Sequence, residues 1–230
     1  MKQIPLPIAA AAEARFDDFV PGANAAALAH LRALAGVSAP VPSVYLWGPS
    51  GSGKTHLLRA LAAARAARGA VAWFDAAAPL PWTVDGGVAL VVVDDAHALD
   101  AARQHAAFAL FVEAAGGSWP LAAAGRMPPV DLPLRDDLRT RLGGGFVFAL
   151  QPLSDAEARA ALRARADARG IALGDDVIDY LLSRFARDMK HLTRLLDRLD
   201  DQAWVDKRAR VTLPLLKRAL ADGGAEVDAR

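Results

Sequence analysis

The strongest chemical signal in the sequence is a glycine-rich stretch that ends in a lysine and a threonine. Residues 48–55 read GPSGSGKT and fit the pattern G-x-x-x-x-G-K-[ST]. In this pattern the glycines let the backbone wrap closely around a phosphate, while successive N–H groups and a helix N-terminus supply positive potential. Lys54 would reach the β and γ phosphates of a nucleotide, and Thr55 would bind Mg²⁺. We expect nucleotide contacts along the whole stretch, from Gly48, Pro49, Ser50, Gly51, Ser52, Gly53, Lys54, Thr55 and His56.

Two aspartates form a second group of candidate residues. Val88–Val93 is apolar throughout and predicts a strand buried on both faces, and Asp94 and Asp95 follow it directly. Open parallel sheets bind ligands beyond the carboxyl ends of their strands. Asp94 is therefore the candidate to hold Mg²⁺ through water, and Asp95 the candidate to polarise an attacking water. Two aspartates after a strand can also be an ordinary polar loop, but the glycine-rich stretch upstream favours the functional interpretation.

Strands and helices that could position these residues alternate along the first two thirds of the sequence. A helix pattern follows Thr55 and is closed by Gly69, and a second helix is expected over Ala101–Ala115. Ala76–Gly87 contains prolines and paired glycines, so it predicts a loop where a crossover helix could stand. The alternation predicts an α/β fold with a five-stranded parallel sheet. Its strands are expected at Val44–Trp47, Ala70–Phe74, Val88–Val93, Trp119–Ala124 and Gly145–Leu150.

The sequence pattern changes after Pro152. Ser154 followed by Glu157 is a capping box, which opens the first of about four helices that continue to Ala221. We therefore predict three parts: an N-terminal tail over residues 1–14, an α/β nucleotide-binding domain over residues 15–152, and a helical lid domain over residues 153–230.

The overall composition excludes several classes of protein. Lys and Arg number 27 against 26 for Asp and Glu, so a net charge of +1 gives no general field for nucleic acid or anionic lipid. Cysteine is absent, which excludes disulfides and thiolate metal sites and fits a cytoplasmic location. No stretch approaches the roughly 20 apolar residues that span a bilayer. The first residues resemble a short signal peptide, but Glu13 and Arg15 interrupt it and argue against export.

Beyond the two motifs, nearly the whole sequence resembles the DnaA-related AAA+ proteins, and most closely those that inactivate the replication initiator. The resemblance implies an AAA+ P-loop NTPase fold with a C-terminal helical lid. It rests on the order of several short matches along the chain. They are RFDDFVPGAN at 15–24, GPSGSGKTHLL at 48–58, VVVDDAH at 91–97, PP at 128–129, TRL at 140–142, LQPLSDAEARAALRARADARGIAL from 150 and RDMKHLTRLLDRLD from 187.

The resemblance assigns roles that the residues alone do not. Phe19 and Val20 belong to the segment that packs on adenine in the family. Arg141 matches the arginine finger, which reaches the nucleotide of a neighbouring subunit. By sequence alone, a surface or helix-capping arginine would be the simpler interpretation of Arg141, because Arg135 and Arg139 lie nearby.

Two positions depart from the family pattern. The sensor 1 strand of the family usually ends in an acidic residue, whereas this sequence reads Ala124, Gly125, Arg126 and Met127, without an evident polar γ-phosphate sensor. Lys190 stands at the sensor 2 arginine, which keeps the charge but loses the bidentate geometry. Both changes weaken the expected hydrolysis and leave binding intact. ADP and ATP are therefore both expected ligands, together with Mg²⁺.

The N-terminal tail resembles the peptides with which replication factors of this kind bind the β sliding clamp, the β subunit of DNA polymerase III. Prolines favour an extended conformation and lower the cost of ordering it. A polar subsite would take the Gln3 amide and apolar pockets the aliphatic side chains. The residues concerned are Gln3, Ile4, Leu6, Pro7 and Ile8. A floppy apolar terminus or an edge strand is the alternative interpretation.

The resemblance implies a regulator of chromosomal replication initiation. The clamp on DNA would capture the tail, the body would dock on ATP-bound DnaA, and Arg141 would complete the hydrolytic site of the partner. Two alternatives stay open: an autonomous ATPase of the helicase-loader type, which would use Asp95 itself, and an adaptor that binds the clamp without catalysis. We also expect self-association through the AAA+ interface. We expect no sequence-specific DNA-binding domain, because the sequence leaves no room for one after the last lid helix.

Overall fold

The computed structural model describes residues 14–37, 41–84, 86–117, 119–168, 170, 172–184, 210–214 and 216. The chain divides into two units, Met1–Gln151 and Pro152–Arg230. The candidate residues that the structure describes all lie in the first unit.

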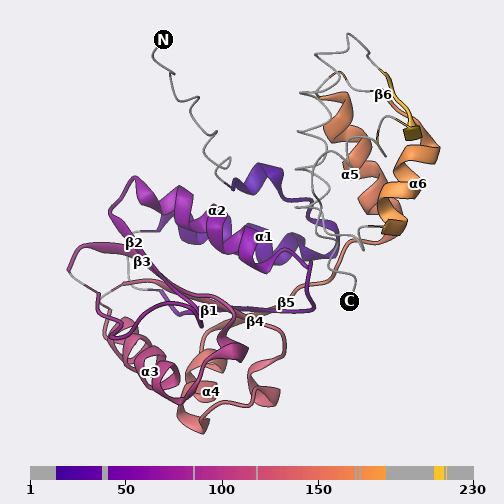
Figure 1. Cartoon of the computed structure of the whole chain (residues 1–230). Coiled ribbons are helices and arrows are strands. Elements are labelled where there is room, and N and C mark those ends of the chain that lie inside the picture. The colour runs from indigo at the N-terminus through magenta and orange to yellow at the C-terminus, as the bar shows by residue number, and fades with distance from the viewer. Residues whose placement is uncertain are drawn as a thin grey trace, which may run out of the picture. The chain divides into compact units, whose positions relative to one another are not determined.

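A five-stranded parallel sheet forms the centre of the first unit (Figure 1). Its strands are β1 (Val44–Trp47), β2 (Ala70–Phe74), β3 (Val88–Val93), β4 (Leu121–Gly125) and β5 (Phe146–Ala149), in the spatial order β2-β3-β4-β1-β5. The expected α/β fold with a five-stranded parallel sheet is confirmed. The start of the fourth strand was predicted too early, because Pro120 has no N–H to donate to the ladder.

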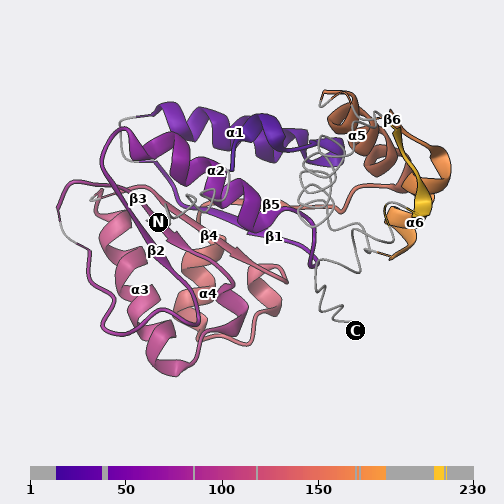
Figure 2. The same ribbon diagram turned by 45° about the horizontal axis from the view of Figure 1, so that its top comes forward.

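Helices cover both faces of the sheet. The two views agree that α1 (Ala25–Gly36) and α2 (Lys54–Ala66) lie on one face, and that α3 (Ala101–Ala115) and α4 (Asp136–Gly143) lie on the other (Figures 1 and 2). Successive strand residues point to opposite faces, so Leu46 packs in the cluster with α1 and α2, and Tyr45 in the cluster with α3 and α4. The described residues also form 3₁₀ turns at Phe16–Asp18 and Gly22–Asn24, before α1, at Ala96–Ala98, after β3, and at Pro129–Asp131, after β4.

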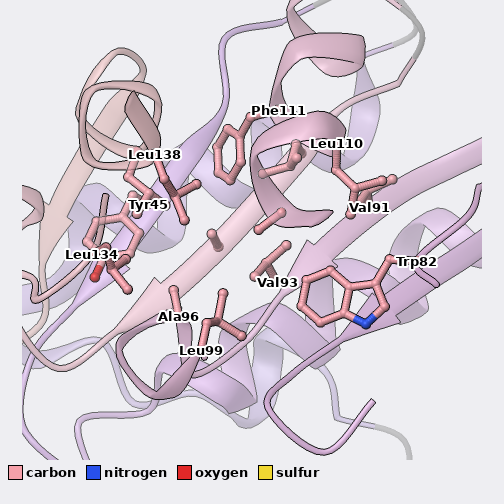
Figure 3. Packing of buried hydrophobic residues seen from close by; sticks show 14 of the residues in the cluster. Tyr45, Trp82, Val91, Val93, Ala96, Leu99, Leu110, Phe111, Leu134 and Leu138 are labelled. Atoms are coloured by element: carbon pink, nitrogen blue, oxygen red, sulfur yellow. The ribbon is translucent and has the colours of Figure 1, made fainter. Parts of the chain in front are cut away.

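The connection from β2 to β3 is a loop, as predicted, and one of its residues is buried in the core. Trp82 is buried in the cluster under α3, where its ring stacks on Phe74 with the ring centroids 4.8 Å apart. Figure 3 shows Trp82 beside Val93 and Leu99 in this cluster. A buried aromatic ring removes a large apolar area from water and so holds the loop against the sheet.

Arg65 ties three elements of the first unit together from inside the core. It is only 4% exposed, and its guanidinium donates to the carbonyl oxygens of Ala89 at 2.6 Å, Leu34 at 2.7 Å and Val37 at 3.1 Å. These acceptors lie at the C-terminal end of α1 and inside β3. Burying a charge is tolerated here because its donors find partners.

The second unit is small and helical in the part that the structure describes. Its helices are α5 (Asp155–Asp167) and α6 (Asp175–Arg184), and the predicted capping box of Ser154 and Glu157 starts α5. A parallel pair of two-residue strands, β6 (Ala172–Leu173) and β7 (Arg210–Val211), was not expected. The later lid helices that the sequence predicts lie largely outside the described residues. Within the described ranges, none of the helices is long and apolar enough to cross a bilayer.

Replacing Arg65 should destabilise the first unit. Arg65→Met keeps the length of the side chain but removes the donor to the carbonyl oxygens of Ala89 and Leu34, so we expect a loss of about 3 kcal/mol in unfolding free energy. Urea unfolding followed by tryptophan fluorescence measures this, since four of the five tryptophans lie in the first unit. The exposed neighbour is the control: Arg68→Met should change the value by about 0.5 kcal/mol or less. Equal losses for both variants would contradict the structural role of Arg65.

Candidate functional site

The glycine-rich stretch forms a tight loop between the end of β1 and the start of α2. Gly51 and Gly53 have φ angles of 78° and 91°, in the left-handed region that glycine tolerates best. A Cβ atom at Gly53 would lie 2.5 Å from the ring of Phe19, and one at Gly48 would clash with the carbonyl oxygen of Leu150. The backbone is therefore packed so closely at both ends of the loop that only glycine fits.

The side chain of Lys54 binds the backbone at the start of this loop. Its ammonium is buried and donates to the carbonyl oxygens of Gly48 and Pro49, both at 2.8 Å. Burial lowers the pKa of Lys54, and the carboxylates of Asp95 and Asp94 act in the opposite direction. In loops of this sequence pattern the lysine reaches the β and γ phosphates of a nucleotide, and a phosphate could replace the two carbonyl oxygens as the stronger acceptor.

Thr55 and Asp94 meet at the start of α2 and the end of β3. The Thr55 hydroxyl donates to Oδ2 of Asp94 at 2.8 Å, and the backbone N–H of Asp95 donates to Oδ1 at 2.9 Å. Asp94 is buried, which raises the pKa of its carboxyl despite these two hydrogen bonds. A hydroxyl and a carboxylate are hard oxygen donors of the kind that Mg²⁺ takes, so the residues present fit that ion.

The remaining magnesium ligands would come from the nucleotide and from water. Among the described residues, no group of three or more His, Asp or Glu side chains could hold a metal ion. Mg²⁺ is usually bound through one or two carboxylates plus phosphate oxygens. A single threonine–aspartate pair is therefore sufficient on the protein side.

Asp95 differs sharply from Asp94 in its surroundings. Its side chain is 56% exposed, and its backbone has φ 49° and ψ 42°, the one positive φ among the described residues other than glycine. Its Oδ1 lies 3.9 Å from Nδ1 of His97, which is too far for a hydrogen bond. Burial lowers the pKa of His97, so its imidazole is neutral at pH 7. Asp95 thus presents a carboxylate to solvent next to the buried Asp94.

The segment before α1, which contains the predicted adenine-binding residues Phe19 and Val20, contacts the start of α2. The ring of Phe19 lies over Gly53 and stacks on His56, with the ring centroids 6.0 Å apart. Nε2 of His56 lies 3.0 Å from the carbonyl oxygen of Arg15. Val20 is half-buried in the same segment. The structure therefore brings Phe19 and His56 to the loop, while their roles in binding adenine stay predictions.

Arg141 lies apart from all of these residues. It is exposed in the last turn of α4, whose buried Leu138 and Leu142 fix the opposite face of the helix. The chain then enters β5 beside the start of β1, where the N–H of Phe146 donates to the carbonyl oxygen of Ser43 at 2.8 Å. The four residues of β1, about 13 Å of strand, separate this end of the sheet from the glycine-rich loop. Arg141 is therefore not brought to the candidate site of its own chain.

Some predicted residues lie outside the part of the chain that the structure describes. These are Lys190 and the tail residues Gln3, Ile4, Leu6, Pro7 and Ile8. Their roles stay predictions.

The end of β4 holds a feature that the sequence did not predict, because it depends on neighbouring strands. Tyr45 of β1 is buried, and its hydroxyl donates to the carbonyl oxygen of Met127 at 2.9 Å. A Cβ atom at Gly125 would clash with that hydroxyl. The absence of a side chain at the end of β4 thus has a steric cause, and Arg126 is the first residue there that extends a side chain. Its only sequence signal is a charge directly after a strand.

Two models of known protein families match the chain, one within each unit. Residues 11–71 match the family described as the bacterial DnaA ATPase domain, and residues 155–220 match the family described as the Hda lid domain. The first match contains the glycine-rich loop and Phe19, and the second covers most of the helical lid.

Solved structures are similar to this chain at the level of fold. Domain III of the replication initiation protein DnaA from Thermotoga maritima is 17% identical, with a TM-score of 0.68, over 92% of this chain and 97% of that one. A replication initiator DnaA bound to AMPPCP and single-stranded DNA is 20% identical, with a TM-score of 0.66, over 81% and 64%. The Thermotoga maritima RuvB Holliday junction branch migration motor is 18% identical, with a TM-score of 0.60, over 84% and 65%. The chain therefore spans slightly less than two thirds of the last two proteins.

The buried carboxyl of Asp94 predicts opposite effects on stability and on metal binding. Because its pKa is raised in the folded state, its stabilising contribution is present at low pH and lost as pH rises through that pKa. At pH 7.5, Asp94→Asn removes a buried charge, and its amide can accept from the Asp95 N–H while donating to the Thr55 hydroxyl, so the melting temperature without ligand should stay equal or rise. The additional rise in melting temperature that Mg²⁺ gives to the nucleotide-bound protein should disappear in this variant.

Thermal unfolding with ADP, with and without Mg²⁺, measures both effects. Asp95→Asn is the control, since that side chain is exposed and makes no hydrogen bond to Thr55. The stability advantage of Asp94→Asn should shrink at pH 4, where the wild-type carboxyl is more protonated. A large drop in melting temperature for Asp94→Asn at pH 7.5 would contradict this account of the site.

Proposed function

The chain is a DnaA-related AAA+ protein similar to Hda, and from this premise we propose that it inactivates DnaA by completing the hydrolytic site of a neighbouring, ATP-bound initiator. As a DnaA-related replication regulator with an AAA+ nucleotide-binding domain, it would bind an adenine nucleotide in its own loop. The ATP hydrolysis that inactivates DnaA would take place in the nucleotide-binding loop of DnaA itself. Its product is DnaA with ADP.

The position of Arg141 carries the proposal. The guanidinium is exposed, has no carboxylate partner among the described residues, and lies at the opposite end of β1 from its own loop. Arg139 in the same helix is paired with Asp136, so the two arginines have different surroundings. An arginine that cannot reach its own nucleotide and is free at a surface fits a role in trans. Placed on a γ-phosphate, such a group accelerates hydrolysis by about 10³ to 10⁵ fold.

The nucleotide bound to this chain would have a structural role. Gly48 packs against the carbonyl oxygen of Leu150, next to the junction of the two units at Gln151 and Pro152. Asn24 holds the last residue of the first unit, since its side chain exchanges hydrogen bonds of 2.9 and 2.8 Å with the backbone of Gln151. When bound, Mg²⁺ would neutralise charge on the phosphates. Thr55 and Asp94 would hold that ion, and Lys54 would hold the phosphates.

Loss of Arg141 should remove the effect on DnaA. We expect Arg141→Ala to lower the hydrolysis rate of DnaA-bound ATP by about 10³ fold, or to the rate of DnaA alone, in the presence of DNA-loaded clamp. Hydrolysis of labelled ATP carried by DnaA measures this. Arg139→Ala is the matched control, because it removes an equal charge from the same helix and should keep most of the rate. If Arg141→Ala stimulates as well as the intact chain, the adaptor alternative replaces this proposal.

Clamp binding by the N-terminal tail and the action of Arg141 on DnaA should be separable by mutation. We propose that residues 3–8 bind the β sliding clamp, in keeping with the sequence prediction and with a cytoplasmic location. Deleting them should weaken clamp binding by at least roughly tenfold, since several apolar contacts are lost together. Arg141→Ala should leave clamp binding unchanged. Binding of the two variants to immobilised clamp measures this, and equal binding by the deletion variant and the intact chain would refute the role of the tail.

A further inference from the structure

One side-chain nitrogen at the candidate site is buried without a hydrogen-bond partner. Among the described residues, three buried side-chain nitrogens lack a partner, and two of them are the indole nitrogens of Trp82 and Trp119. Those two rings pack in the cluster under α3. The third nitrogen is Nδ1 of His97, which follows the acidic pair in the sequence. Buried polar atoms are almost always paired in native proteins, so we expect this nitrogen to find a partner in another state of the site.

The backbone around His97 is held by the core. The 3₁₀ turn that contains His97 is closed by a hydrogen bond of 2.8 Å from the N–H of Ala98 to the carbonyl oxygen of Asp95. Ala96 and Leu99 are buried, and Figure 3 shows both in the cluster under α3. The backbone positions of Asp95 and His97 are therefore set, and only their side chains can change the distance between them.

The carboxylate of Asp95 is within reach of the unpaired nitrogen. Oδ1 of Asp95 lies 3.9 Å from Nδ1 of His97, about 1 Å beyond the usual length of a hydrogen bond. The Asp95 side chain is 56% exposed and that of His97 only 16%, so the aspartate is the partner with more freedom to rotate. A neutral imidazole carries one N–H, and a proton on Nδ1 would give Oδ1 a donor. A small rotation of the Asp95 side chain would close this bond.

The imidazole of His97 also lies among the charged groups of the site. Burial lowers the pKa of His97, and among the charges that act on it Asp95 has the largest effect. Arg126, Lys54 and Asp94 act on it as well. These residues come from the ends of β3 and β4 and from the glycine-rich loop. The unpaired nitrogen of His97 thus belongs to the candidate site, unlike the two indole nitrogens in the core.

We infer that His97 positions Asp95 for catalysis: with ATP bound, Nδ1 of His97 donates to Oδ1 of Asp95, and the chain slowly hydrolyses its own ATP. This inference rests on the proposed nucleotide binding and is independent of the action of Arg141 on a partner. The hydrogen bond holds one carboxylate oxygen and leaves the other free to accept a proton. His97 is a positioning residue, because it acts through Asp95.

Asp95 takes the proton of the attacking water in this reaction. The water oxygen forms a bond to the γ phosphorus, and the bond from that phosphorus to the β–γ bridging oxygen breaks. The bridging oxygen keeps the electron pair and leaves with ADP, while the γ-phosphoryl group leaves as inorganic phosphate. A carboxylate that rotates freely is seldom oriented toward the water, and the hydrogen bond from His97 raises that fraction. The gain therefore appears in kcat, and KM stays the same.

Steady-state hydrolysis of ATP by the full chain, with Mg²⁺ and without DnaA or clamp, tests this inference. His97→Ala should lower kcat about tenfold, the effect of one charge-assisted hydrogen bond, and leave KM within about twofold. His97→Asn should keep at least about half of kcat, because its amide nitrogen takes the place of Nδ1. In His97→Gln the amide nitrogen reaches toward the place of Nε2, so kcat should stay as low as in His97→Ala. His105→Ala is the control: it removes an imidazole from the exposed surface of α3 and should change neither constant.

A double-mutant cycle separates the positioning of Asp95 from general damage to the fold. Asp95→Asn should lower kcat by at least about 100-fold, since it removes the base. If His97 acts through Asp95, adding His97→Ala to Asp95→Asn should cost less than about twofold more. A merely structural role of the buried imidazole would instead give a second loss of about tenfold in that background.

The inference is wrong if the loss from His97→Ala repeats in full in the Asp95→Asn background, if His97→Asn loses as much as His97→Ala, or if KM rises while kcat does not fall. Titration calorimetry with ADP distinguishes this failure from a failure of the proposed function. If the intact chain binds ADP but hydrolyses ATP no faster than Asp95→Asn, the inference fails and nucleotide binding stands. If the intact chain binds no ADP, the proposed nucleotide binding is refuted, and the inference falls with it.

Discussion

A single hydrogen bond, from the hydroxyl of Thr55 to the carboxylate of Asp94, joins the two halves of the site. It connects the first turn of α2 to the end of β3 across 2.8 Å. Because Asp94 is buried, this bond offsets part of the cost of removing a carboxylate from water. The same two side chains are the ones that would hold a magnesium ion, Asp94 through water. The packing of α2 against β3 in one hydrophobic cluster keeps these two side chains together.

Much of the fold follows from local patterns in the sequence. Strands such as Val88–Val93 are buried on both faces and so read as uninterrupted apolar runs. Helix α1 gave no clear signal, since alanines are spread over its whole surface and blur the periodicity that marks an amphipathic helix. The spatial order of the strands is a tertiary property, which spacing along the chain does not contain. The two-residue strands β6 and β7 are too short for any pattern to indicate.

The site was predictable where its residues are neighbours in sequence. The glycine-rich loop and Asp94 belong to contiguous motifs whose chemistry dictates their spacing. In the sequence, Arg126 was visible only as a departure from the family pattern. Its position in the fold could not be predicted, because its neighbours come from three different strands. Tyr45, which explains why Gly125 has no side chain, precedes its bonded partner Met127 by 82 residues. No local pattern could connect them.

Arg141 and the loop lie at opposite ends of the sheet, which fits the proposal that the chain acts on the nucleotide of a second subunit. The chain would hold one nucleotide and act on another. A single-turnover experiment tests this most directly: load the chain with a non-hydrolysable ATP analogue, load DnaA with labelled ATP, combine them with DNA-loaded clamp, and follow release of labelled phosphate. The account predicts stimulated release although the chain's own nucleotide cannot be cleaved. Release no faster than from DnaA alone would contradict it.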